Sequence, residues 1–201
     1  MFIKRIPAGI YAANCYIVMD EISKDIILID IGGDAEDIIK EVKNLNGNVR
    51  GIILTHGHVD HVSGVLDFKE EYDVPVYLSH KDEELMIQGT YIYGSFNDKR
   101  ADFSLKEGEV ITLGSIKINV LETPGHTPGG VSFVIEDNVF TGDSLFYGSI
   151  GRTDLSGGNY GELIDSIKDK LLVLPEETKV YSGHGPMSTV GNEKRSNPFL
   201  R

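Results

Sequence analysis

Cysteine, basic residues and long apolar runs are all scarce in this sequence of 201 residues. The single cysteine, Cys15, excludes a disulfide within the chain, which favours a reducing compartment such as the cytoplasm. With 19 Lys and Arg against 31 Asp and Glu, the net charge is −12, which disfavours nucleic-acid phosphates as partners. No apolar run approaches the roughly 18 residues of a membrane span, and no signal-peptide pattern stands out at the start. We therefore expect a cytoplasmic protein that binds neither membrane nor nucleic acid.

Glycine, by contrast, is plentiful: 23 glycines mostly separate short apolar runs. These runs are rich in Val, Ile, Leu, Phe and Tyr, the composition that strands favour. The predicted strands are Phe2–Ile6, Cys15–Met19, Ile26–Asp30, Gly51–Thr55, Pro75–Ser79, Ile116–Leu121, Val131–Ile135, Val139–Thr141 and Lys179–Ser182.

Amphipathic patterns between some of these runs predict helices. Asp34 is placed to cap the first, which is expected to end before Gly47. A second covers Ser63–Tyr72. A third follows Asn159, whose spacing to Glu162 is that of a capping box. Strands and helices that alternate in places, with hairpin-like pairs elsewhere, predict an α/β chain with a mixed sheet or two sheets.

The length suits a single domain over residues 1–201 with a sizeable core. The segment 88–106 is polar and aromatic with weak periodicity, and it is long for a connector in a compact domain. Loops of this length often act as lids over functional sites. Its aromatic residues Tyr91, Tyr93 and Phe96 are expected either to line a pocket or to pack the loop against the core.

The strongest chemical signal is the segment Thr55-His56-Gly57-His58-Val59-Asp60-His61. It follows a predicted strand and precedes a helical pattern, so we place it in a strand-to-helix loop. Crevices at the carboxyl ends of strands are where α/β proteins build their sites. Imidazole and carboxylate groups at this density predict a metal site.

Three further residues repeat this placement, each beside a glycine and just past a predicted strand: His126, Asp143 and His184. Strand ends that are far apart in the sequence can converge on one crevice. Together with the first segment, they supply more ligands than one tetrahedral zinc requires. A structural zinc site would normally use cysteines. The set therefore predicts two divalent ions that share a carboxylate.

This set, HxHxDH at 56–61 followed by His126, Asp143 and His184, resembles the metallo-β-lactamase superfamily over essentially the whole chain. Segments 142–146, 148–154 and 183–186 are similar to the small, single-domain glyoxalase II-like (hydroxyacylglutathione hydrolase-like) hydrolases. The resemblance implies an α/β fold, a four-layer αββα sandwich with the metal site at one rim of the sheets.

The resemblance also implies a role for each ligand. The first metal would be held by His56, His58 and His126; the second by Asp60, His61 and His184; and Asp143 would bridge them. Asp60 and Asp143 would serve catalysis through a metal-bound hydroxide that attacks a carbonyl carbon. Zinc is expected, although iron or manganese would also suit these ligands. The presence of both Asp60 and Asp143 argues against a true β-lactamase.

Fewer residues indicate the substrate. Asp30, at a predicted strand end, is expected to orient a metal-bound imidazole. Tyr147 and Arg152 are expected to contact a small-molecule substrate, since Arg152 aligns with a basic substrate-contacting residue of glutathione-specific glyoxalase II. Asp154 stands where those enzymes carry a tyrosine, and few residues follow His184, where they add a helical domain. Both differences argue against glutathione specificity.

Three activities fit this reading of the sequence. The first is hydrolysis of a thioester such as a hydroxyacyl-thiol. The second is hydrolysis of a lactone or another ester by the same fold. The third, from a different class of enzyme, is the iron-dependent persulfide dioxygenase reaction found in the superfamily.

Overall fold

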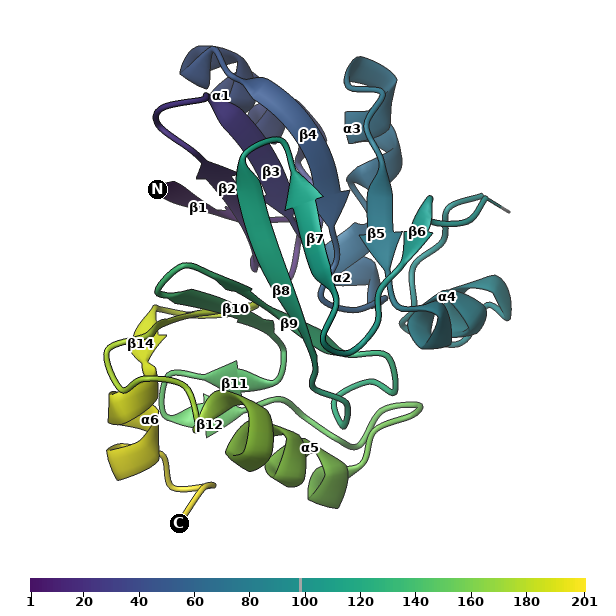
Figure 1. Ribbon diagram of the computed structural model, residues 1–201. Helices are drawn as coiled ribbons and strands as arrows, with labels where there is room; N and C mark the ends of the chain where they lie inside the picture. Colours follow the sequence, from purple (N-terminus) through teal and green to yellow (C-terminus); the bar gives the residue numbers. More distant parts are fainter. Residues whose placement is uncertain (98) are drawn as a thin grey trace.

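The computed structural model describes residues 1–97 and 99–201, so residue 98 of the predicted loop 88–106 lies outside the description. Two six-stranded sheets form the centre of the molecule (Figure 1). The first sheet has the order β1-β2-β3-β4-β5-β6, with β1 to β3 antiparallel and β3 to β6 parallel. Its strands are β1 (Phe2–Ala8), β2 (Ala13–Met19), β3 (Asp25–Ile29), β4 (Asn48–Ile53), β5 (Val76–Leu78) and β6 (Phe103–Ser104).

The second sheet has the order β14-β13-β10-β9-β8-β7, in which only the pair β10 and β13 is parallel. Its strands are β7 (Val110–Leu113), β8 (Ile116–Glu122), β9 (Val131–Ile135), β10 (Asn138–Gly142), β13 (Lys179–Ser182) and β14 (Ser188–Thr189). A small hairpin follows β10 and consists of β11 (Leu145–Phe146) and β12 (Ser149–Ile150).

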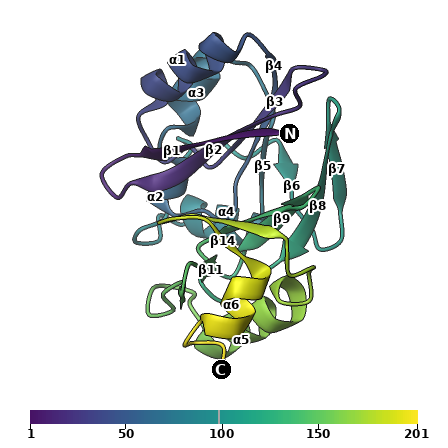
Figure 2. The ribbon, with the colours of Figure 1, turned by 90° about the vertical axis from the view of Figure 1, so that its left-hand side faces the viewer.

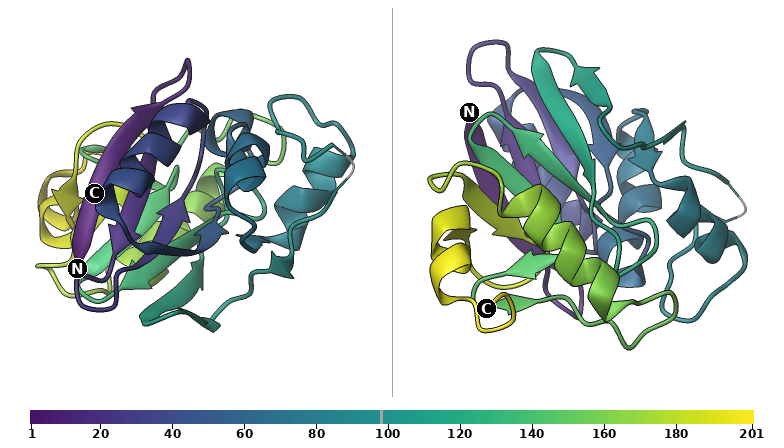
Figure 3. Two further views of the ribbon diagram at one scale, coloured as in Figure 1. Left: turned by 90° about the horizontal axis from the view of Figure 1, so that it is seen from above. Right: turned by 60° about the horizontal axis from the view of Figure 1, so that its bottom comes forward.

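Helices cover the outer faces of both sheets. Figure 2 shows α1 and α3 beyond the first sheet and α5 and α6 beyond the second. The helices are α1 (Ala35–Leu45), α2 (Val59–Val62), α3 (Val65–Glu71), α4 (His80–Ile87), α5 (Tyr160–Ser166), its π-helical continuation η1 (Ile167–Leu171) and α6 (Val190–Ser196). The views in Figure 3 show the same outer positions of α1 and α5. Among the described residues, no helix has the length and apolar character that crossing a membrane requires.

The layers follow from the alternation of side chains along the strands. In β2, Cys15 and Ile17 belong to the apolar cluster beneath α1 and α3, whereas Tyr16 and Val18 belong to the cluster between the two sheets. A third cluster lies between the second sheet and α5, η1 and α6. Three apolar interfaces between four layers make this an αββα sandwich, which confirms the predicted fold.

The predicted strands all correspond to observed ones, but several elements were missed. Helices α2, α4 and α6 and the short strands β6, β7, β11, β12 and β14 were not predicted; α2 places Asp60 and His61 in a helix and not in the predicted loop. The prediction that the Asp34 side chain caps α1 is wrong, because this side chain makes no hydrogen bond to the helix. Asp34 precedes the helix, but its backbone is left-handed (φ 48°), and its carboxylate accepts a hydrogen bond from the Gly9 N–H at 2.8 Å. Asn159 does cap α5, accepting from the Glu162 N–H at 3.2 Å.

The core between the sheets yields a stability prediction. Phe133 of β9 is fully buried in the cluster between the sheets. Phe133→Ala should lower the free energy of unfolding by about 3–5 kcal/mol, because it removes buried apolar area and leaves a cavity. Urea denaturation followed by circular dichroism measures this. Phe199→Ala is the matched control, since Phe199 is 46% exposed, and it should cost about 1 kcal/mol or less. Equal losses for the two variants would contradict the proposed core.

Candidate metal centre

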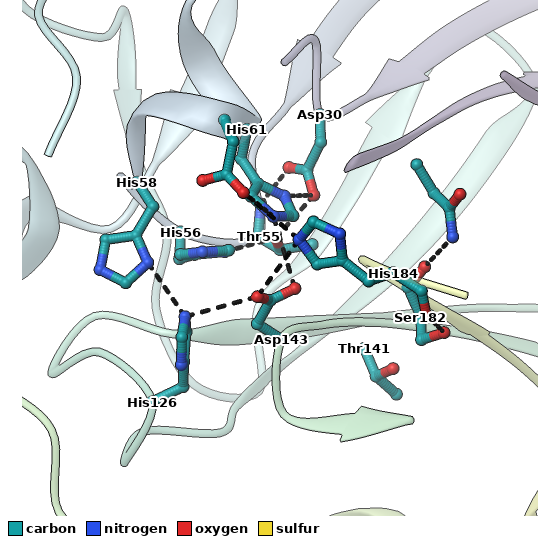
Figure 4. A network of polar contacts seen from close by, with 12 residues as sticks. Asp30, Thr55, His56, His58, His61, His126, Thr141, Asp143, Ser182 and His184 are labelled. Carbon is teal, nitrogen blue, oxygen red and sulfur yellow. Dashed lines mark hydrogen bonds and ion pairs between the residues drawn. The ribbon is translucent and has the colours of Figure 1, made fainter. Parts of the chain in front are cut away.

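Four loops bring the predicted ligands to one rim of the sandwich (Figure 4). His56 and His58 lie in the loop after β4, and Asp60 and His61 lie in α2 directly behind it. The other three ligands come from the second sheet: His126 follows β8, Asp143 follows β10 and His184 follows β13. The site therefore lies where the two sheets meet, with ligands from both. His80, the remaining histidine, is exposed at the start of α4.

Asp143 lies at the centre of this arrangement. One of its oxygens, Oδ1, is 3.4 Å from His61 Nε2, and the other, Oδ2, is 3.6 Å from both His126 Nε2 and His184 Nε2. On the far side, His184 Nε2 is 3.3 Å from Asp60 Oδ2. The potential ligand atoms form three groups, and within each group they lie within 4.8 Å of one another. The first group is His56, His58 and His126, and the second is His56, His61 and Asp143. The third is Asp60, His61 and His184.

The free lone pairs of the site are what a metal requires. His56 Nε2, His61 Nε2 and Asp143 Oδ1 are buried and have no hydrogen-bond partner. Buried polar atoms are almost always paired, so a cluster of unpaired acceptors is typical of a cation-binding site. Imidazole nitrogens and carboxylate oxygens are the donor set of zinc and related ions. The histidine and aspartate clusters fit a dinuclear metal site.

On three of the imidazoles, hydrogen bonds hold the ring nitrogen Nδ1, which faces away from the site. His61 Nδ1 donates to Asp30 Oδ2 at 2.8 Å, and His126 Nδ1 donates to the Arg152 carbonyl at 2.7 Å. Thr55 Oγ1 donates to the same Asp30 oxygen at 2.7 Å and is 3.0 Å from His56 Nδ1, from which it can accept. These contacts leave Nε2 of His56, His61 and His126 with its lone pair toward the site, whereas His58 presents Nδ1, 3.0 Å from His126 Nε2.

Asp30 itself is held in an unusual backbone conformation. Its φ is 53°, in the left-handed region that L-residues rarely adopt, directly after β3. This conformation turns the carboxylate back over the end of β4, where Oδ1 accepts the Thr55 N–H at 2.8 Å. Asp30 thus holds the start and the end of the ligand loop, a placement that agrees with the orienting role expected for it.

The charges of the site favour the metal-binding forms of His56, His58 and Asp143, whereas they favour the protonated form of His61. Burial and the neighbouring histidines lower the pKa of His56 and His58, that of His58 to about 3. Burial also opposes protonation of His61, but the charges of Asp143 and Asp30 outweigh it and raise the pKa of His61. Burial favours the neutral carboxyl of Asp143, yet the charge of His61 outweighs it and holds the pKa of Asp143 low. A bound cation would replace the proton of His61 as the partner of Asp143.

A cavity of about 700 Å³ opens directly over these residues. Its volume lies within the range of small-molecule sites. Beyond the ligands, its walls come from Tyr11, Val59, Tyr91, Ile92, Phe146, Ser149, Ile150, Arg152 and Leu155. The walls are mostly apolar, and Arg152 is the one lysine or arginine among the described residues that line them.

The predicted substrate residues differ in their placement. Arg152 lines the cavity, where its guanidinium forms a two-point ion pair with Asp154 at 2.7 Å for each contact. Tyr147 does not line it: this residue is 58% exposed in the turn of the β11–β12 hairpin, and its neighbour Phe146 faces the cavity instead. Alternation along the hairpin sends adjacent side chains in opposite directions.

The aromatic residues of the segment 88–106 divide in the same way. Tyr93 and Phe96 are buried and pack the loop against the first core cluster, and the Tyr93 ring lies 4.8 Å from that of His58. Tyr91 is 82% exposed and lines the cavity. Sequence reasoning missed Thr55, Tyr11 and Leu155, for which no local pattern exists.

Comparisons with known proteins agree with this geometry. A family model described as the metallo-beta-lactamase superfamily matches residues 8–184. Hydroxyacylglutathione hydrolase GloC of Haemophilus influenzae is 36% identical over 215 residues, which cover 100% of this chain and 98% of that protein. The crystal structure of BLEG-1 B3 metallo-beta-lactamase is 38% identical with a TM-score of 0.91, covering 99% of each chain. TTHA1623 in a di-iron-bound form is 37% identical with a TM-score of 0.83, covering 98% of this chain and 100% of that one.

An αββα sandwich with histidines and carboxylates converging at one rim defines a class of metallo-hydrolase folds. The chain belongs to the metallo-β-lactamase superfamily. The alignment with GloC spans nearly the full length of both proteins, so the short segment after His184 is no evidence against glutathione.

The contacts of Asp30 generate a testable prediction. Asp30→Asn keeps the shape of the side chain but loses the charge that pairs with His61, so metal affinity should fall by about 10–100-fold. Competition with a chromogenic chelator measures this affinity. Asp25→Asn is the matched control, because Asp25 is a buried aspartate at the other end of β3 that binds Arg50 and lies outside the metal groups. Equal metal affinity in the two variants would show that Asp30 does not orient the ligands.

Proposed function

We propose that this protein is a hydrolase that uses two divalent cations to cleave a thioester such as a hydroxyacyl-thiol. In this proposal His56, His58 and His126 would hold the first cation, and Asp60, His61 and His184 the second. Asp143 would be available to both. The observation that carries the proposal is the position of Asp143, whose two oxygens lie within 3.6 Å of imidazole nitrogens from both groups.

The cations, when bound, would supply activated water at neutral pH and polarise the carbonyl oxygen of the substrate. The chain itself orients the reacting groups. Asp60 and Asp143 bring negative charge that balances the cations, while the buried imidazoles keep their lone pairs directed inward through Asp30 and Thr55. The apolar walls from Phe146, Ile150 and Leu155 exclude bulk water from one side of the cavity.

Two observations support a thioester as the substrate. A relative that aligns with the whole chain is named hydroxyacylglutathione hydrolase. The cavity also combines an apolar wall with a single arginine, which suits a small molecule with both an acyl part and a polar thiol part. We expect zinc in both positions, with iron or manganese as alternatives; TTHA1623 carries two irons. We further expect neither nucleic acid nor membrane as a partner, in a cytoplasmic protein.

A substrate panel on protein of known metal content tests the proposal. Zinc-loaded protein should hydrolyse hydroxyacyl-thiols without consuming oxygen, and chelation should abolish the activity until zinc is restored. Asp143→Ala is the internal control and should lose at least about 100-fold in kcat/KM, as expected when a ligand of a catalytic metal is removed. Preference for a lactone, or oxygen consumption with a persulfide, would overturn the thioester assignment. Full activity of metal-free protein would overturn the proposal itself.

The Arg152–Asp154 pair predicts how the protein selects among thiols. Both side chains are exposed, by 60% and 68%, and Asp154 occupies two guanidinium N–H groups that a substrate carboxylate would use. Asp154→Asn should raise kcat/KM for thioesters of a carboxylate-bearing thiol by about two- to fivefold, as suits an exposed ion pair. Thioesters of an uncharged thiol should be unaffected. Combining Asp154→Asn with Arg152→Ala should remove the gain; a gain that persists would show that Arg152 does not bind the substrate.

A further inference from the structure

Asp82 is a buried carboxylate outside the set of proposed ligands. It lies in the first turn of α4 with 0% exposure. Its oxygens do not cap its own helix. Instead, Oδ2 accepts the Gly57 N–H at 2.8 Å and Oδ1 accepts the Gly129 N–H at 2.7 Å. No lysine or arginine pairs with it in the described parts of the chain, 1–97 and 99–201, so backbone N–H groups are its compensation for burial.

The two glycines belong to the loops that carry the three-histidine group. Gly57 separates His56 from His58, and Gly129 lies in the same loop as His126. These loops come from different sheets, and Asp82 bonds to both of them. The carboxylate therefore fixes how far the His56–His58 loop stands from His126.

The fit around this carboxylate is tight. A Cβ atom at Gly129 would come within 2.5 Å of Asp82 Oδ1, and one at Gly57 would meet the Asp82 Cβ and the Met86 sulfur at 3.1 Å. Both loops can approach the carboxylate only because these positions lack side chains. No such contact joins Asp82 to Asp60, His61 or His184 among the hydrogen bonds of the described residues.

We propose that Asp82 is a positioning residue for the three-histidine group alone, and that it sets the affinity of that group for its cation. This inference rests on the proposed two-cation function. It differs from the role of Asp30, which bonds to Thr55 and His61 of the same segment.

Zinc titration of variants that retain one group each tests this assignment. Asp60→Ala isolates the three-histidine group, and His126→Ala isolates the second group. Adding Asp82→Asn to Asp60→Ala should lower the zinc affinity by about 10–100-fold, the effect typical of partners that orient ligands. Adding it to His126→Ala should change the affinity by less than about threefold. A chromogenic chelator competing for Zn²⁺ provides the readout, independent of enzyme activity.

Two further variants separate positioning from general stability. Gly129→Ala places a methyl group against Asp82 Oδ1 and should reproduce the selective loss while keeping the carboxylate. Glu193→Gln is the matched control: Glu193 is an equally buried carboxylate that accepts the Gly148 N–H at 2.9 Å, and its loss should not distinguish the two groups. Equal losses in both backgrounds, or none, would overturn the inference alone. Wild-type protein that binds fewer than two Zn²⁺ would overturn the proposed function with it.

Discussion

The arrangement of the rim depends on the buried Nε2 atoms of His56 and His61, which face the site beside Asp143 and have no hydrogen-bond partner. Such a group is unfavourable to assemble, because each nitrogen gives up water and gains nothing from the protein. It can persist only if the surrounding structure holds every ring in place and a cation returns the lost interactions. The ligands come from both sheets, so the site forms only when the apolar cluster between the sheets is packed.

Buried polar side chains outside the ligand groups hold each loop in position. Asn14, at the start of β2, donates to the Ser182 carbonyl at 2.9 Å and so supports the loop of His184. Asp30 holds the start and the end of the loop after β4, and Asp82 holds Gly57 between them. The loops also approach one another closely: a Cβ atom at Gly183 would lie 2.1 Å from Asp143 Oδ1, which explains the glycine before His184.

The local pattern of the sequence was sufficient to predict the main strands and the metal ligands. Apolar runs predicted the main strands, and ligand-type residues at successive strand ends predicted which side chains converge, because both are properties of short segments. The role of Asp82 could not be predicted, since its partners Gly57 and Gly129 are distant in sequence and backbone donors leave no compositional trace. Asp34 was misjudged because a distant N–H group, from Gly9, takes the carboxylate away from the helix it precedes.

The fold and the metal site do not determine the substrate, because different residues form the metal site and the cavity wall. The groups that hold the metal ligands are buried and bonded to backbone, so a change in one of them disturbs several loops at once. The cavity wall includes exposed side chains on loops, among them Tyr11, Tyr91 and Arg152, which can change without disturbing the ligands. Similar chains can therefore be named a β-lactamase or a hydroxyacylglutathione hydrolase. Specificity in this fold therefore depends on the least constrained residues around the site. In this chain these include Arg152, whose guanidinium is paired with Asp154 and so presents fewer free N–H groups to a substrate.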